Sequence, residues 1–247
     1  MTLIASPEEF DRPHGQIVRY AFSDGRPPLR SIVAVAESFR SVTLSALHAT
    51  TGSKDSFLLS GHHPDGTPDN EHRHAYYLPQ VGKNGMLDGL LVVSPCTRFS
   101  DAELEALRIV RRLQWNGPST KLILELIDID DLKDRVVASN WVTTTPYVPI
   151  RRFWGTSGKR HLIPEKQLIS AVHSSISDEI IGEVKLEPWV QIRVRIATNG
   201  NKVSPAPVPL RLGFAVQFTT NRAICGPIVL GHSCHFGLGQ FAPVESY

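Results

Sequence analysis

The order of predicted strands and helices constrains the fold of this 247-residue chain more than any other feature. Residues 29–49 carry apolar side chains at helical spacing, and Ser100 with Glu103 forms a capping box that opens a second helix, predicted to run to about residue 113. Strand patterns occupy residues 16–22, 56–60, 74–78, 89–93 and 121–129. The order is strand, helix, strands, helix, strand, which is that of a ferredoxin-like, RNA-recognition-type unit.

The same order of elements partly recurs in the second half, without a repeat of the sequence itself. Residues 141–151 read as a strand, Pro164 opens a helix, and residues 190–196 and 210–219 alternate as strands around a Gly- and Pro-containing hairpin loop at 199–209. A glycine-rich loop takes the place of the second helix. We therefore predict an α+β fold of tandem ferredoxin-like halves, 1–135 and 136–247, with the boundary near 130–140.

Charge is divided unequally between these halves. Residues 1–131 carry 13 Lys and Arg and 17 Asp and Glu, a net charge of −4, whereas residues 132–247 carry 13 and 7, a net charge of +6. A basic C-terminal half suits a polyanion such as nucleic acid. Three cysteines give no disulfide framework, and the N-terminal residues do not resemble a signal peptide. With no apolar run near the roughly 18 residues of a membrane helix, we expect a soluble, cytoplasmic protein without a membrane partner.

Residues 61–79 (GHHPDGTPDNEHRHAYYLP) hold four of the ten histidines. Enzymes that cleave RNA without metal need one group to deprotonate the 2′-hydroxyl and another to protonate the leaving 5′-oxygen, and imidazole suits both transfers. His62, His72 and His74 are the candidate catalytic residues, the last two sharing a strand face. Two other interpretations stay open: a polar surface loop, or a metal site in which His62 or Asp65 joins His72 and His74.

Residues 226–241 (GPIVLGHSCHFGLGQF) form a late glycine-rich loop. Glycine lets the backbone approach a bulky anion, and N–H groups there can point at phosphate. We predict RNA binding at Gly231, His232, His235, Gly237 and Gly239, and expect valine at Gly237 or Gly239 to spare the fold. Zinc ligation by Cys225, His232, Cys234 and His235 is disfavoured because Cys-x-x-Cys spacing is missing.

The two stretches together resemble a known family, the Cas-six (RAMP) superfamily of CRISPR-associated repeat-RNA endoribonucleases. The glycine loop carries part of the likeness. The more specific part is a Gly-His-x-x-Asp-Gly-x-Pro, His-Arg-His, Tyr-Leu-Pro pattern, similar to the Cas-six-like part of type I-G (formerly I-U) proteins. In this chain its residues are Gly61, His62, Asp65, Gly66, Pro68, His72, Arg73, His74, Tyr77, Leu78 and Pro79. Those proteins usually carry a Cas-five-like part as well, for which 247 residues leave no room.

Further basic residues are candidates for RNA contact. Arg151, Arg152, Lys159 and Arg160 flank Phe153 and Trp154, a mixture that suits phosphate contact and base stacking or, equally, a solvated turn. Arg193 and Arg195 share a strand face, which is either an RNA-binding stripe or simply the solvent-exposed face of a sheet. Arg73 is also assigned to RNA binding. His48, followed by Lys54, matches the place of a catalytic histidine in several superfamily members, although a helix C-terminus alone explains it.

The resemblance implies a metal-independent endoribonuclease that processes CRISPR repeat RNA into guide RNA, leaving a 2′,3′-cyclic phosphate and a 5′-hydroxyl. It also implies that the protein stays bound to the guide RNA and joins other Cas proteins in an effector complex. No cofactor is expected. A non-catalytic guide-RNA-binding subunit and a metal-dependent phosphoesterase remain the alternatives.

Overall fold

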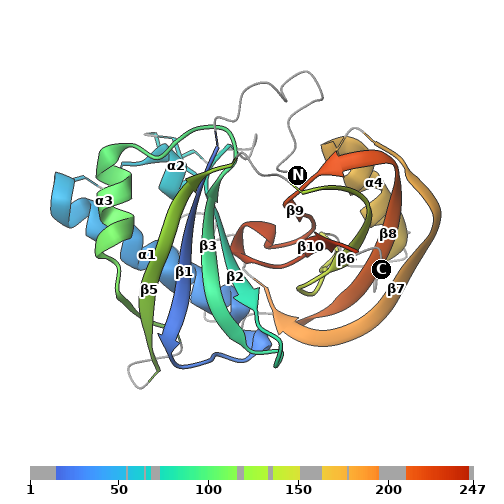
Figure 1. Cartoon of the computed structure of the whole chain (residues 1–247), viewed down its shortest axis with the longest axis horizontal. Coiled ribbons are helices and arrows are strands. Elements are labelled where there is room, and N and C mark those ends of the chain that lie inside the picture. Colours follow the sequence, from blue (N-terminus) through green and yellow to red (C-terminus); the bar gives the residue numbers. More distant parts are fainter. Residues whose placement is uncertain are drawn as a thin grey trace.

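The computed structural model describes residues 15–53, 55–63, 65–67, 73–115, 120–132, 136–150, 163–176, 178–194 and 210–244. These residues form two five-stranded antiparallel sheets, the first covered on one face by α-helices and the second accompanied by the helix α4 (Figure 1). The glycine-rich loop lies between the two sheets.

The first sheet has the strand order β2-β3-β1-β5-β4. Helices α1 and α3 cover one of its faces, and the short helix α2 leads into the histidine stretch (Figure 1). Its elements are β1 (Gln16–Asp24), α1 (Ile32–Thr51, after a 3-10 turn at Leu29–Ser31), α2 (Phe57–Ser60), β2 (Tyr76–Val81), β3 (Leu87–Ser94), α3 (Asp101–Ile109), β4 (Arg112–Gln114) and β5 (Lys121–Asp131).

Alternation along β1 explains how this sheet packs on both faces. Val18, Tyr20 and Phe22 are buried in the core beneath the helices, whereas Ile17 is buried in the cluster on the opposite face. Side chains of a strand alternate between faces, so one strand serves both cores. The predicted capping box is present, because Ser100 accepts from the Glu103 N–H while the Glu103 carboxylate accepts from the Ser100 N–H.

The second sheet has the order β7-β8-β6-β10-β9. Its elements are β6 (Val137–Thr143), α4 (Pro164–Ile176), β7 (Ile180–Arg193), β8 (Leu210–Cys225), β9 (Ile228–Val229), a 3-10 turn η3 (Cys234–Phe236) and β10 (Gln240–Pro243). The order β7-β8-β6-β10 repeats β2-β3-β1-β5 of the first half. The tandem ferredoxin-like prediction is confirmed, and the loop with η3 does stand where a second helix would be.

Several predicted elements differ from the structure. Residues 57–60 are the helix α2 and not a strand, because the Ser56 hydroxyl caps the Leu59 N–H. Helix α3 ends at Ile109, and the chain continues as the edge strand β4. Strand β6 occupies Val137–Thr143 instead of 141–151, while β7 begins earlier and β8 ends later than their alternation indicated. The loop at 199–209 lies outside the described residues.

An apolar interface joins the two halves. Strand β5 ends at Asp131 and β6 begins at Val137. Residues of both sheets then meet in one cluster, composed of Ile17, Tyr76, Leu78, Val93 and Leu132 from the first half and Val229 and Cys234 from the second. Phe236 and Leu238 reach further, into the core beneath α1. Among the described helices, none is long and apolar enough to span a bilayer.

Candidate functional site

The histidine stretch and the glycine-rich loop meet at one point. His74 comes just before β2, and His235 belongs to η3 in the loop. Their rings stack with centroids 4.4 Å apart, and the ring of Tyr76 stacks on His235 at 4.2 Å. The two motifs that the sequence marks separately therefore form one site at the junction of the halves.

Gly61 shapes the other side of His74. It caps the C-terminus of α2 in a left-handed conformation, with φ +70°. A Cβ built on Gly61 would lie 3.1 Å from the His74 ring, so only glycine lets the ring sit there without displacement. His62 is the next residue along the chain.

Hydrogen bonds orient both histidines. The Nδ1 atom of His74 is 3.2 Å from the Ala75 carbonyl, and that of His62 is 2.9 Å from the Ser60 carbonyl. A carbonyl only accepts, so Nδ1 carries the proton in each contact. His62 is exposed and His74 is half-buried. His72 lies outside the described residues, while Arg73 is described and exposed.

The loop glycines are packed against protein and are buried. A Cβ on Gly237 would lie 2.6 Å from Cδ of Pro79, and one on Gly231 would lie 2.5 Å from the Val148 carbonyl oxygen. A Cβ on Gly239 would overlap the Leu230 carbonyl. The expectation that valine at Gly237 or Gly239 spares the fold is therefore wrong.

Backbone donors of the same loop are also engaged. The Gly237 N–H donates to Cys234 and the Gly239 N–H to Pro146. These two N–H groups close the turn and bridge to the strand end, so they are not directed at a phosphate. RNA binding by the loop stays a prediction.

His232 has a distinct environment in the loop. Its N–H donates to the Val148 carbonyl, and its Nδ1 lies 2.8 Å from the Ser233 hydroxyl. Partial burial, and then the positive charge of Arg211, lower the pKa of His232 to about 4. The ring is neutral near pH 7, so it can contact RNA by hydrogen bonding but not as a cation.

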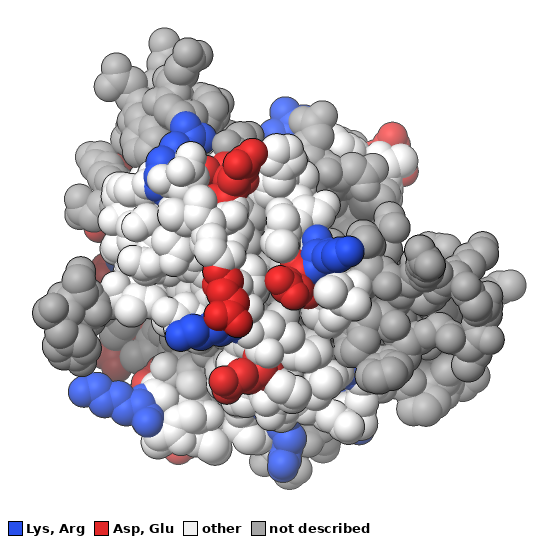
Figure 2. All heavy atoms as spheres, turned by 90° about the vertical axis from the view of Figure 1, so that its right-hand side faces the viewer, with Lys and Arg blue, Asp and Glu red and all other residues white. Residues whose placement is uncertain are grey.

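Of the remaining predicted RNA contacts in the second half, the structure describes Arg193. Arg193 ends β7 and is exposed. On the described part of the face that carries β7 and β8, basic and acidic side chains are interspersed (Figure 2). Arg151, Arg152, Lys159, Arg160 and Arg195 fall outside the described residues. Arg193 stands between Ile192 and Val194, which are buried in the core of the first half.

No group of three or more His, Cys, Asp and Glu side chains among the described residues is placed to hold a metal ion. Within the suggested zinc group, Cys234 Sγ lies 3.7 Å from His235 Nδ1. Burial raises the pKa of the Cys234 thiol, which disfavours the thiolate that zinc binds. His72 is outside this description, so the histidine-based metal site keeps its status as an alternative.

Tyr76 was not predicted as a site residue, and His235 was not predicted to touch a catalytic candidate. The role of Tyr76 could have been found, because Tyr76 follows His74 by two residues and residues two apart share a strand face. The contact between His235 and His74 depends on how the two halves pack, which no local pattern encodes.

No protein-family model matches the chain, and no curated protein is similar to it in sequence. Among solved structures, one described as a CRISPR-associated protein Cas6 matches with a TM-score of 0.53, at 12% identity, over 94% of this chain and 99% of that one. The chain has the Cas6 fold. A Cas6-related protein from Pyrococcus furiosus (12% identity, 95% and 99% covered) and a Cas6 product complex (12% identity, 94% and 100% covered) both give a TM-score of 0.49.

Proposed function

We propose that this protein is an endoribonuclease that cleaves CRISPR repeat RNA. The observation that carries the proposal is the stacking of His74 on His235 at the junction of the two halves of a Cas6 fold. The solved structure with that fold is described as a CRISPR-associated protein. Two imidazoles in contact offer the proton acceptor and donor that RNA cleavage needs.

The proposed reaction needs no group beyond the RNA and the protein. A base takes the proton of the 2′-hydroxyl, and the 2′-oxygen then forms a bond to phosphorus. The bond from phosphorus to the 5′-oxygen breaks, and an acid protonates that oxygen. The products are a 2′,3′-cyclic phosphate and a 5′-hydroxyl end, and the reaction is independent of metal.

The chain offers several side chains for these roles. We assign proton transfer to His62, His72 and His74, with His235 as a direct partner of His74. Two imidazolium rings about 4 Å apart repel by roughly 1–4 kcal/mol at effective dielectric constants of 80 to 20. Protonation of His74 therefore opposes protonation of His235, which favours one neutral and one charged ring, as acid–base catalysis requires.

The net charge of +6 on residues 132–247 supports a polyanionic partner. We further propose that the protein remains on its product and joins other Cas proteins as a subunit of an effector complex. The basic residues of the second half, including Arg193, and the loop residues His232 and His235 would hold the RNA.

Incubation with the repeat RNA of the neighbouring CRISPR array, in excess EDTA, tests the proposal. The expected result is one cleavage within the repeat, with a cyclic phosphate that only treatment with acid or a phosphatase acting on cyclic ends removes. His173, exposed on α4, gives the control: His173→Ala should cleave normally while His74→Ala fails. Loss of cleavage in EDTA with rescue by a divalent cation would favour the phosphoesterase alternative, and tight binding without cleavage would favour the non-catalytic RNA-binding subunit.

A further inference from the structure

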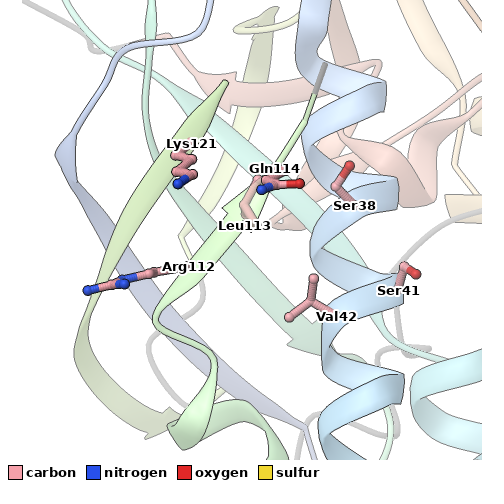
Figure 3. A pocket seen from close by; sticks show the side chains of 7 residues that line it. All are labelled: Ser38, Ser41, Val42, Arg112, Leu113, Gln114 and Lys121. Atoms are coloured by element: carbon pink, nitrogen blue, oxygen red, sulfur yellow. The ribbon is translucent and has the colours of Figure 1, made fainter. Parts of the chain in front are cut away.

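A concave surface lies at the edge of the first sheet opposite to β2, between α1 and β4 (Figure 3). It encloses about 540 Å³ and is lined by Ser38, Ser41, Val42, Arg112, Leu113, Gln114 and Lys121. We call it the α1–β4 groove. Its volume is in the range of sites that take small ligands, and it includes none of the residues assigned to cleavage.

The lining combines an apolar floor with polar and cationic groups. Leu113 is buried and Val42 packs against the same core. Gln114 points toward α1 and Ser38 (Figure 3), and it lies directly opposite Lys121 in the pairing of β4 with β5. Arg112 points outward from the rim (Figure 3). The seven lining residues include no Asp or Glu, so the groove suits an anion joined to a flat, apolar group that also forms hydrogen bonds.

That chemistry is the chemistry of a nucleotide. A base can lie on aliphatic side chains while its edge meets a hydroxyl and an amide, and the neighbouring phosphates can meet Lys and Arg at the rim. A free anion such as phosphate would not use the apolar floor, and an acidic peptide has no flat group to cover Val42 and Leu113. The groove therefore matches a nucleotide better than either.

Helix α1 links the groove to the candidate site. Its first residue, Ile32, lies against Gly237 of the loop. Ser38 and Val42 are six and ten residues further along the same helix, about 9 and 15 Å at 1.5 Å per residue. An extended single strand of RNA that leaves the junction along α1 would reach the groove within a few nucleotides.

We propose that the α1–β4 groove binds one nucleotide of single-stranded RNA outside the cleavage site. The base occupies the space between Val42, Leu113 and Gln114, and the flanking phosphates contact Lys121 and Arg112. The groove acts in binding only, so the proposal is independent of whether the protein cleaves RNA.

The test uses a short fluorescein-labelled single-stranded RNA of mixed sequence, titrated by fluorescence anisotropy over a range of salt concentrations. The variants are Lys121→Ala with Arg112→Ala, which removes the rim cations, and Ser38→Leu, which fills the groove. Lys83→Ala with Arg108→Ala, at two exposed residues of the first half outside the groove, is the control that also removes one Lys and one Arg. Circular dichroism melting establishes that each variant is folded.

We expect the rim variant to bind more weakly and to lose about 0.7 from the slope of log K against log salt for each phosphate contact removed. The filled variant should bind more weakly with its salt slope nearly unchanged, because it displaces the base. Unchanged affinity in both variants would overturn the proposal. A groove that binds AMP, in a protein whose RNA binding is the same in the wild type and both variants, would also overturn the proposal. That result would identify a free nucleotide as the occupant.

Failure of this proposal and failure of the proposed function give different results. His74→Ala should abolish cleavage and leave the groove-dependent salt slope as it is. A protein that never cleaves repeat RNA, and yet shows the groove effect, would refute the nuclease and retain the groove.

Discussion

At the scale of single residues, His74 is the best-defined member of the site. It is held by Gly61 on one side, by the Ala75 carbonyl at Nδ1, and by the ring of His235. A ring fixed by three contacts needs little reorganisation when it transfers a proton, which is a condition for efficient acid–base catalysis.

The first prediction concerns this pair. His74→Ala or His235→Ala should lower the cleavage rate about 100-fold or more, the usual contribution of one acid–base group, while binding of an uncleavable 2′-deoxy repeat changes little. Single-turnover rates measured with saturating protein separate the two effects. Equal rates in both variants and the wild type, together with loss of cleavage in His48→Ala, would relocate the site to the end of α1.

The second prediction concerns pH. The pKa of His232 is lowered to about 4 in the folded protein, against an ordinary 6.5. Between these values the unfolded chain binds a proton that the folded chain does not, so stability is complete above about pH 6.5 and is lost as the pH falls toward 4. His232→Asn should therefore flatten the change in melting temperature between pH 7 and pH 5. His173→Asn, at an exposed histidine, is the control and should keep the wild-type slope.

At the scale of elements, the periodicity of apolar residues predicted the strands and helices that have one buried face. It failed where a cap, or a Gly or Pro within a strand, determines the local structure. Helix α1 and strand β1 were found because their buried residues repeat regularly. The four residues of α2 are too short to show a helical period, and only the Ser56 cap indicates their state. Only the C-terminal part of strand β7 was predicted, because Gly182 and Pro188 interrupt the alternation of apolar and polar residues before it.

The glycine loop shows the same division between pattern and packing. Its sequence marked the glycines as unusual, and the structure shows that they are closely packed against other parts of the protein. Gly237 adopts φ +87° and lies against Pro79 and Ile32. Both neighbours belong to the first half, so no pattern within the loop could have revealed them.

The third prediction follows from this contact. Gly237→Ala should destabilise the protein through two effects, about 1–2 kcal/mol for a left-handed alanine and about 1–3 kcal/mol for overpacking. Each kcal/mol lowers the melting temperature of a chain of this length by roughly 2–4 °C. Gly85→Ala is the matched control, because Gly85 has φ +72° with nothing within 4 Å of an added Cβ. An equal decrease in melting temperature in the two variants would show that Pro79 and Ile32 move away from the added Cβ without loss of stability.

At the scale of the whole molecule, the two halves share apolar side chains across their boundary. Val148, Ile192, Val194, Phe236 and Leu238 belong to the second half and are buried in the core of the first. The sequence indicated two halves from the repeated order of elements, but it carried no signal for this shared core. The candidate site stands on the same interface, since His74 and His235 come from opposite halves. Loss of the packing between the halves would therefore separate the two histidines.

The last prediction tests that dependence. The halves should unfold in one cooperative transition, because neither can lose its partner without exposing apolar surface. Trp115 packs against the first core and Trp141 is buried in the second, and the other two tryptophans, Trp154 and Trp189, also belong to the second half. Trp115→Phe therefore leaves reporters in the second half only, and a variant with Phe at positions 141, 154 and 189 leaves Trp115 as the reporter of the first. Denaturation followed by fluorescence should give the same midpoint for both variants once their own stability changes are measured by circular dichroism.

Leu238→Ala, which opens a cavity costing about 2–5 kcal/mol, should move both midpoints together and slow cleavage wherever it loosens His235. Two separate midpoints, with only the Trp115 half affected by Leu238→Ala, would show that the halves fold independently and that the stacked histidines are held by local contacts alone.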